Sequence, residues 1–569
     1  MIKHKWIGGV TVLLMTAVLL LMAGAYLFPS ALTAFSDSSE LPYVSAMDKT
    51  QILDVQIIAD ENEWADMLDN AIAEEYIPAT VIINGTKIEN AGIRPKGNSS
   101  LRTVAQDDTT DRYSFKIEFD HYISGQTWMG LDKIVLNNMQ GDSTYMKEYL
   151  SYDLMDYAGV EAPLYTYSNI AVNGETWGFY LAVEVLEDSY AKRVYGNDHG
   201  KLYKPESMEM GGGGQRNEES ATENRQRPDQ LTEPEDMPDK NKQGGPGGFG
   251  GQSGGAALQY TDDEISSYST IFDSAVFDTS DKDFARVINA LKKLNAGEDL
   301  ESAVDVEATL KYFAAHTVLV NLDSYVSNMC HNYYLYEENG QLTMLPWDFN
   351  LSFGGFQSDG SSSVVNFPID TPVSNVSLEE RPMIGKLLEV PQYLELYHSY
   401  LAEIINGYFN SGVFEQTIDS LDVLISSYVE ADPTSFYDYT SYKNGVAELK
   451  KLGLLRAQSV EGQLSGVIPS TTEGQNASPD LLVEASDINL SLLGTMGGGF
   501  GGRPSGNRPE DMPEHIKSGP PQGNPEFTAE ASTSASGFDK TAWIILGSCT
   551  AFFSAGLLFV IFFRRRRSG

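Results

Sequence analysis

Asp323-Ser-Tyr-Val-Ser-Asn328 follows an apolar pattern that predicts a long helix over residues 306–322. A strand pattern, the turn Asn339-Gly340 and a second strand pattern then predict a tight hairpin over residues 332–345. Pro346-Trp-Asp-Phe-Asn350 stands at the exit of that hairpin. The segment therefore brings two carboxylates, Asp323 and Asp348, and the amide of Asn328 into one short stretch of chain.

Phosphoryl transfer needs such groups: one carboxylate orients the attacking hydroxyl, and an amide with a second carboxylate holds metal. Each signal alone is weak, because Asp-x-x-x-x-Asn should occur roughly twice by chance in a chain of this composition. An Asp after a hairpin is also more often a turn or capping residue. The helix, the spacing, the hairpin and the Asp between aromatic residues together favour the chemical interpretation.

The order of secondary structure predicts the fold class. Strand patterns dominate residues 50–205, with runs at 52–58, 80–83, 113–119 and 133–136, a hairpin at 170–183, and helices at 61–73 and from Asp142 to about 157. Helical patterns dominate residues 258–470, at 281–294, 306–322, 378–388, 393–408 and 413–429. We therefore expect an α+β, bilobal protein-kinase-like fold, with a β-rich N-lobe and a helical C-lobe flanked by membrane spans.

A small-residue loop in the first lobe is a candidate phosphate site. Gly92-Ile-Arg-Pro-Lys-Gly-Asn-Ser-Ser100 contains Arg94 and Lys96 for charge, and small residues such as Ser99 that let the backbone approach a phosphate. An ordinary turn is about as compatible with this sequence. Lys116, on the next expected strand, lies where a kinase keeps its phosphate-binding lysine, although a solvent-facing lysine opposite Phe115 and Ile117 fits the same alternation.

Composition excludes several classes of function. The chain has 569 residues and a formal net charge of −40, which argues against a nucleic-acid surface. Its two cysteines, Cys330 and Cys549, exclude a disulfide scaffold and a cysteine zinc site. No His-Glu-x-x-His spacing occurs among the seven histidines.

The two ends predict a membrane location. Residues 1–34 have a basic start and an apolar run, which fits a signal peptide or an N-terminal anchor, and 542–563 is an apolar span followed by the basic tail 564–569. Residues 206–257 and 494–539 are rich in Gly, Pro and Glu, which predicts a disordered insertion and a stalk. We expect a bacterial cell-membrane protein with its catalytic domain outside the cytoplasm, tethered by one or two spans.

Five motifs resemble the spore coat protein H (CotH) kinase family in sequence and in order. They are Gly92-Ile-Arg-Pro-Lys-Gly-Asn-Ser-Ser, Ser114-Phe-Lys-Ile-Glu-Phe, Gly178-Phe-Tyr-Leu-Ala-Val-Glu184, Asn321-Leu-Asp-Ser-Tyr with Asn328, and Pro346-Trp-Asp-Phe-Asn350. The resemblance covers residues 50–470. It implies an atypical protein kinase that uses ATP and Mg²⁺ or Mn²⁺ to phosphorylate serine or threonine of cell-surface or spore-coat proteins.

The resemblance also implies residue roles. Asp323 would be the catalytic carboxylate, Asn328 and Asp348 would hold metal, and Lys116 would reach the ATP phosphates. Glu184 would be a lysine partner or a nucleotide contact. Glu148 is another candidate partner for Lys116, but a helical projection from Met146 predicts that it faces solvent.

Two alternatives stay open at this point. One is a non-catalytic surface adhesion or assembly protein on a kinase-like fold, which would have no need of Lys116, Asp323, Asn328 and Asp348 together. The other is a cell-envelope polymer-processing enzyme that uses phosphate chemistry, and no residue distinguishes it.

Overall fold

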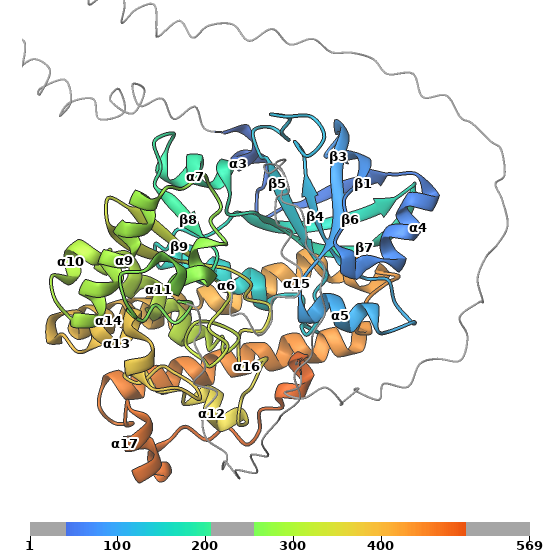
Figure 1. The fold of residues 1–569 in the computed structure, drawn as a ribbon. Coiled ribbons are helices and arrows are strands. Elements are labelled where there is room, and N and C mark those ends of the chain that lie inside the picture. Colours follow the sequence, from blue (N-terminus) through green and yellow to red (C-terminus); the bar gives the residue numbers. More distant parts are fainter. Residues whose placement is uncertain (1–40, 206–254, 495, 497–569) are drawn as a thin grey trace, which may run out of the picture. The chain divides into compact units, whose positions relative to one another are not determined.

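A computed structural model gives the structure of the protein and describes residues 41–205, 255–494 and 496 (Figure 1). The strands are β1 Ile52–Ile58, β2 Ile77–Ile83, β3 Thr86–Lys96, β4 Ser114–Glu118, β5 Lys133–Asn137, β6 Tyr165–Val172, β7 Glu175–Glu184, β8 Lys201–Tyr203, β9 Tyr333–Glu338 and β10 Gln341–Pro346. The α-helices are α3 Pro42–Ala46, α4 Glu61–Asp69, α5 Ser99–Ala105, α6 Lys147–Tyr157, α7 Asp188–Tyr195, α8 Ser269–Phe272, α9 Asp281–Ala296, α10 Leu300–Ala303, α11 Val306–Leu319, α12 Ser361–Val365, α13 Pro382–Leu388, α14 Pro391–Ile404, α15 Val413–Ala431, α16 Tyr439–Leu464 and α17 Thr472–Ala477. Shorter helical turns are η1 Ala71–Ala73, η2 Ile265–Tyr268, η3 Leu378–Glu380, η4 Ile405–Phe409, η5 Pro479–Leu481 and η6 Leu490–Leu493.

The first seven strands close into a barrel in the order β1-β2-β3-β4-β5-β7-β6. Closure comes from a parallel pairing of β1 with β6, in which Ile52 lies opposite Tyr167. The expected bilobal protein-kinase-like fold flanked by membrane spans is therefore wrong. Strand patterns located most of the strands but not β8. Pairing between segments this far apart in the sequence leaves no local signal, so the closed sheet was missed.

Successive side chains of β4 point to opposite faces of the sheet and so lie in two environments. Phe115 and Ile117 lie inside the barrel core, whereas Ser114 and Lys116 lie on the other face. Each inward residue that leaves water contributes roughly 1.5–3 kcal/mol, so a continuous apolar interior stabilises the closed sheet.

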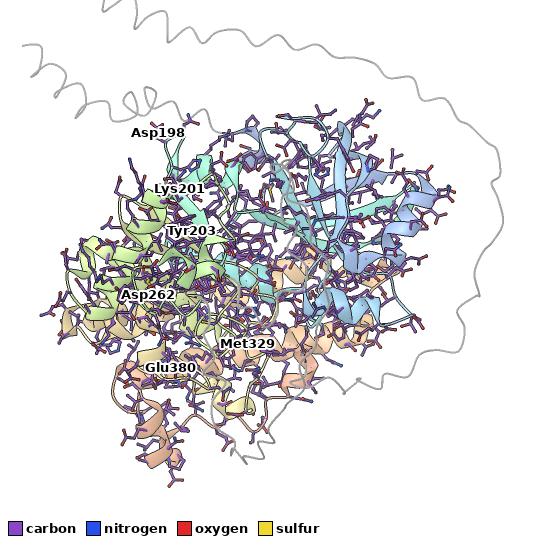
Figure 2. All side chains as sticks on the ribbon, in the orientation of Figure 1. Asp198, Lys201, Tyr203, Asp262, Met329 and Glu380 are labelled. Atoms are coloured by element: carbon purple, nitrogen blue, oxygen red, sulfur yellow. The ribbon has the colours of Figure 1, made fainter. Side chains whose placement is uncertain are left out.

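The helices and a second small sheet form the rest of the described chain. β8 pairs with β9 of the predicted hairpin, so a strand from the first stretch extends a sheet in the second. Lys201 and Tyr203, labelled in Figure 2, mark this strand beside the helical part. The 26-residue helix α16 was not predicted, because buried glycines at Gly445 and Gly453 interrupt its apolar pattern.

Helix α6 lies between the barrel and the helical part, and its side chains are buried on nearly every face (Figure 1). The side chain of its N-cap residue, Met146, makes no capping hydrogen bond. Instead, Asp142 accepts a hydrogen bond from the Lys147 amide at 2.8 Å and others from the Thr144 amide and hydroxyl. The predicted capping role of Asp142 thus operates from a turn placed before the helix.

The membrane predictions need a correction. In residues 41–205 and 255–494 no helix combines the length and the apolar content that crossing a bilayer requires. The expected membrane-anchored location is therefore wrong for the part of the chain that the structure describes. The predicted signal or anchor 1–34, span 542–563 and tail 564–569 lie outside the described residues, as do nearly all of the predicted insertion and stalk.

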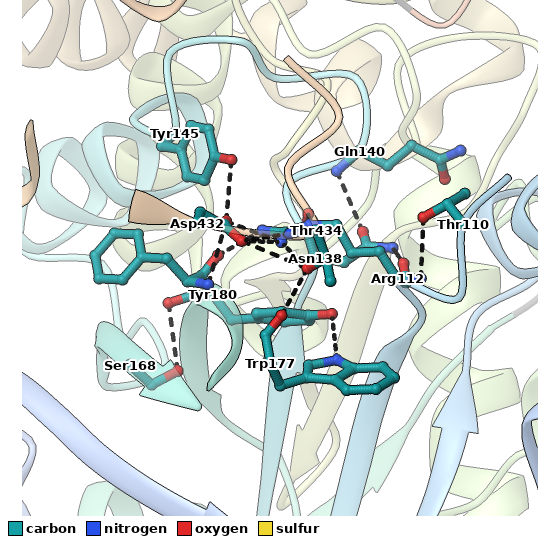
Figure 3. A network of polar contacts seen from close by, with 11 residues as sticks. Thr110, Arg112, Asn138, Gln140, Tyr145, Ser168, Trp177, Tyr180, Asp432 and Thr434 are labelled. Carbon is teal, nitrogen blue, oxygen red and sulfur yellow. Dashed lines mark hydrogen bonds and ion pairs between the residues drawn. The ribbon is translucent and has the colours of Figure 1, made fainter. Parts of the chain in front are cut away.

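A buried ion pair joins the barrel to the helical part (Figure 3). Arg112, just before β4, contacts Asp432, just after α15, at 2.8 Å, and both side chains are 0% exposed. The guanidinium also donates to the carbonyls of Asn138 and Phe179 and to the Thr434 hydroxyl. Its hydrogen-bonding groups therefore have partners on three separate segments, which satisfies the requirement that a buried charge be paired.

We expect Asp432→Asn to lower the free energy of unfolding by about 3 kcal/mol or more, because it leaves a buried guanidinium without its counter-charge. Asp419→Asn is the matched control. Asp419 forms a comparable pair with Lys450, but its side chain is 70% exposed, so the loss should stay below about 1 kcal/mol. Urea unfolding of the full chain measures both values. Equal losses would contradict the structural importance of the Arg112–Asp432 pair.

Candidate active site

Asp348 occupies a constrained backbone position at the exit of the β9–β10 hairpin. Its φ is +60°, an uncommon conformation for a residue other than glycine. Two side chains hold it there: the Asp348 amide donates to the Tyr152 hydroxyl at 3.2 Å, and Asn321 Nδ2 donates to the Asp348 carbonyl at 3.4 Å. Such strain persists where the surroundings fix it, and it is concentrated at functional sites.

Asp348 shares a small cavity with residues from the barrel and from α6. The lining residues are Lys96, Ser100, Ser114, Asn137, Asn138, Met139, Glu148, Asp348 and Asn350, and the cavity holds about 30 Å³. Lys96 at the end of β3 donates to Asn137 Oδ1 at 3.1 Å. Asn137 in turn donates to Glu148 Oε2 at 2.9 Å, so an amide links the lysine to the carboxylate.

Glu148 is 1% exposed, and Tyr152, one helical turn further on, donates to its Oε1 at 3.2 Å. Burial, with the negative charge of Asp348 nearby, raises the pKa of Glu148 to about 7. Burial also lowers the pKa of Lys96, while Asp348 and Glu148 act in the opposite direction. Perturbed titratable groups that share a cavity are typical of catalytic sites.

The donor set of this cavity fits a hard divalent cation. Asp348 and Glu148 offer carboxylate oxygens, and Asn137 and Asn350 offer amide oxygens. Across the described part of the chain no three His, Cys, Asp or Glu side chains cluster as a protein-only metal cage. Two carboxylates with neighbouring amide oxygens suit Mg²⁺, which proteins bind through one or two carboxylates together with water and substrate phosphates.

Asp323 lies on a neighbouring segment and is connected to Asp348 through Asn321. Asn321 Oδ1 accepts from the Asp323 amide at 3.2 Å, while Asn321 Nδ2 reaches the Asp348 carbonyl. The two carboxylate oxygens of Asp323 contact different partners: Oδ1 lies 2.6 Å from His331 Nε2, and Oδ2 accepts from Asn332 Nδ2 at 3.1 Å. A nitrogen and a carboxylate oxygen this close share a proton in a hydrogen bond.

The structure separates the predicted phosphate residues. Lys96 lies in the cavity, whereas Lys116 pairs with Glu187 at 2.9 Å. Arg94 pairs with Glu74 at 2.7 Å and does not line the cavity. The loop itself is short, because Gly92–Lys96 belong to β3 and α5 begins at Ser99. Ser100, and not Ser99, lines the cavity.

The other predicted residues lie apart from the cavity as well. Glu184 is buried and binds Arg193 at 2.6 Å and the Tyr43 hydroxyl at 2.5 Å, so its carboxylate is already satisfied. Asn328 is exposed, and the amide that contacts Asp323 is that of Asn332. The predicted metal role of Asn328 and the predicted nucleotide role of Glu184 remain predictions.

Sequence reasoning missed Glu148 as a site residue because the helical projection assumed one buried face and one solvent face, whereas α6 is buried on nearly every face. A useful signal was available: Glu148 and Tyr152 are four residues apart, so they share one helix face and can form a hydrogen bond. Asn137 carried no signal, since it is a polar residue at the end of a short strand whose three central residues are apolar.

The raised pKa of Glu148 predicts a pH-dependent stability in the metal-free protein. The folded chain holds a proton up to about pH 7 that the unfolded chain releases near its ordinary value of 4.5. The contribution of the protonated Glu148 carboxyl group to the free energy of unfolding is therefore complete below about pH 4.5, and it is lost as the pH rises through 7. Glu148→Gln does not titrate, so its stability relative to wild type should rise by ~2–3 kcal/mol between those pH values.

Urea unfolding in chelator from pH 4.5 to 8 measures this difference. Glu338→Gln, at an exposed position on β9, removes the same charge and should follow the pH dependence of the wild type. A Glu148→Gln curve parallel to that of the wild type would contradict the electrostatic account of the cavity.

Comparison with known proteins agrees with the family resemblance. The model of the family described as "CotH kinase protein" matches residues 93–460, which is more than half of the chain. An inner spore coat protein H-like protein of Bacillus subtilis (strain 168) is 30% identical over 93 residues, which cover 16% of this chain and 28% of that protein. The match to the family model includes neither β1 and β2 nor the segment after residue 460. This chain belongs to the CotH kinase family.

Proposed function

We propose that this chain is a protein kinase that transfers the γ-phosphoryl group of ATP to a serine or threonine hydroxyl. The observation that carries the proposal is the convergence of Lys96, Glu148 and Asp348 on one cavity, with Asp323 hydrogen-bonded into the same network through Asn321. Family membership supports the same reaction class.

Five of the cavity residues have a role in nucleotide binding in this proposal. Lys96 supplies a positive charge for the phosphates, and the Trp347 ring, 5.8 Å from its Nζ, lies beside it. Asp348 and the amide of Asn350 offer oxygens for Mg²⁺ or Mn²⁺. A bound divalent cation would neutralise phosphate charge during transfer. Glu148 fixes Asn137, which in turn fixes Lys96.

Asp323 orients the acceptor in this proposal. The substrate hydroxyl oxygen forms a bond to the γ-phosphorus, while the bond from phosphorus to the β-bridging oxygen breaks and ADP leaves with that electron pair. The hydroxyl proton passes to the Asp323 carboxylate. His331 and Asn332 keep that carboxylate in place by forming one hydrogen bond with each oxygen.

The relative's name suggests the class of substrate. The similar protein from Bacillus subtilis is named for the inner spore coat, and the matched region covers 28% of its length. We propose a spore coat protein as the substrate of this chain. If the wild-type chain binds no nucleotide with any divalent metal, the non-catalytic assembly role takes the place of the kinase proposal.

Substitution of Asp348 and substitution of Asp323 should affect ATP binding and phosphate transfer differently. Asp348→Ala removes the proposed metal ligand, so metal-dependent ATP binding and phosphate transfer should both be lost. Asp323→Ala should retain most ATP binding, whereas transfer falls by about 10²- to 10⁴-fold, because only the positioned base is removed. Calorimetric titration with Mn²⁺ and ATP, and transfer of labelled phosphate to a coat-protein extract, measure the two effects. Normal transfer by both variants would refute these assignments.

Two lysines on adjacent strands allow a matched test of the phosphate-binding residue. Lys96→Met should weaken Mn²⁺-dependent ATP binding by at least about tenfold, because a phosphate contact to a desolvated charge is lost. Lys116→Met removes the same charge, and Glu187 keeps its pair with Lys133, so ATP binding should stay near the wild-type value. The reverse result would restore the family-derived role of Lys116.

A further inference from the structure

The chain returns to the active site after the region that matches the family. We name residues Leu490–Gly494 together with Met496 the C-terminal strap. Its turn η6 is followed by Gly494, and Leu493 is buried. These residues lie 30 or more positions beyond the end of the family match at residue 460.

The strap is hydrogen-bonded to the loop that forms one wall of the cavity. This loop, residues 138–146, carries Asn138 and Met139, which line the cavity. The Ser143 amide donates to the Leu493 carbonyl at 3.1 Å, and the Ser143 hydroxyl donates to the Leu492 carbonyl. The loop is therefore joined to the strap through both polar groups of one residue.

The strap also contacts the start of the helix that carries Glu148. Lys147 is 0% exposed, and its ammonium donates to the Gly141 carbonyl at 2.7 Å and to the Gly494 carbonyl at 2.9 Å. An ammonium buried in this way needs its acceptors, since an unpaired buried charge is costly. Lys147 immediately precedes Glu148, so the strap carbonyl helps to fix the first turn of α6.

The segment after Asp348 is the third contact. The Met496 amide donates to the Gly355 carbonyl at 3.1 Å, and Met496 forms a parallel bridge with Phe356. The strap thus touches all three elements that shape the cavity opposite the barrel: the 138–146 loop, the start of α6, and the 350–357 segment.

We propose that the C-terminal strap is a positioning element of the active site, so that the catalytic unit extends to residue 496. This inference rests on the proposed nucleotide site. Withdrawal of the strap would remove acceptors from Lys147 and from Ser143, and the loop, Glu148 and the segment after Asp348 would lose a shared support. Displacements of about 1 Å at such positions can cost on the order of 10²-fold in rate.

Two glycines offer a matched test. Gly494 has φ +70°, and a Cβ there would meet the Ser143 amide at 2.8 Å and the Gly141 carbonyl at 2.9 Å. Gly466 has φ +74°, with no atom within 4 Å of its virtual Cβ. Alanine therefore brings the same backbone strain at both positions, and only Gly494→Ala also pushes the strap away from the loop.

The experiment compares both variants in the full chain by hydrogen exchange and by Mn²⁺-dependent ATP binding. For Gly494→Ala we expect amide exchange in residues 138–150 to accelerate at least about tenfold, and ATP affinity to fall by about tenfold or more. Peptides from β2 and β3 should exchange as in wild type. Gly466→Ala should match wild type in both measurements.

Ser143→Ala keeps the inference testable if Gly494→Ala does not fold, because it removes only the hydroxyl that donates to Leu492. We expect about a three- to tenfold change in the same direction. If Gly494→Ala and Ser143→Ala both behave like Gly466→Ala in exchange and in binding, the inference is refuted. If wild type binds no ATP, the proposed function fails, and exchange in residues 138–150 still decides whether the strap holds the loop.

Discussion

The buried Arg112–Asp432 ion pair is the constraint on which the rest of the structure depends. A guanidinium without solvent must find all its partners in the protein, and these partners lie in β7, in the loop after β5 and in the connection from α15 to α16. The barrel and the helices can therefore meet in one arrangement that satisfies the charge. Asn138, whose carbonyl accepts from Arg112, is also a wall of the cavity, so the same interaction fixes the site.

The charges of the cavity explain what it is suited to bind. Lys96 shares a small cavity with two carboxylates, Glu148 and Asp348. Burial, with the charge of Asp348 nearby, raises the pKa of Glu148 to about 7, and a divalent cation beside Asp348 would lower it again. The negative charge of phosphate groups would then be balanced by the positive charges of Lys96 and the cation together. The strained backbone of Asp348, held by Tyr152 and Asn321, keeps this geometry prepared before any ligand arrives.

Local signals predicted much of the fold and part of the site. Period-two alternation located β4, a short apolar run located β5, and Asn339-Gly340 located the hairpin that positions Asp348. Pairing between distant segments was not predictable, so the parallel β1–β6 contact and the closed barrel were missed. The residues of the site were likewise predictable only where the local sequence carried a signal. Asp348 was visible in its motif, but the preference for Lys96 over Lys116 depends on which strand end reaches Asn137 at the end of β5. The role of Glu148 depends on the burial of α6 on nearly every face.

The most direct test of the account is a crystal structure of the full chain with Mn²⁺ and a non-hydrolysable ATP analogue, with anomalous data at the manganese edge. The account predicts a manganese peak bound by the Asp348 carboxylate, with the analogue's phosphates reaching Lys96. A peak at Asp323 and Asn328 without Asp348, or phosphates bound at Lys116 and Arg94, would contradict it.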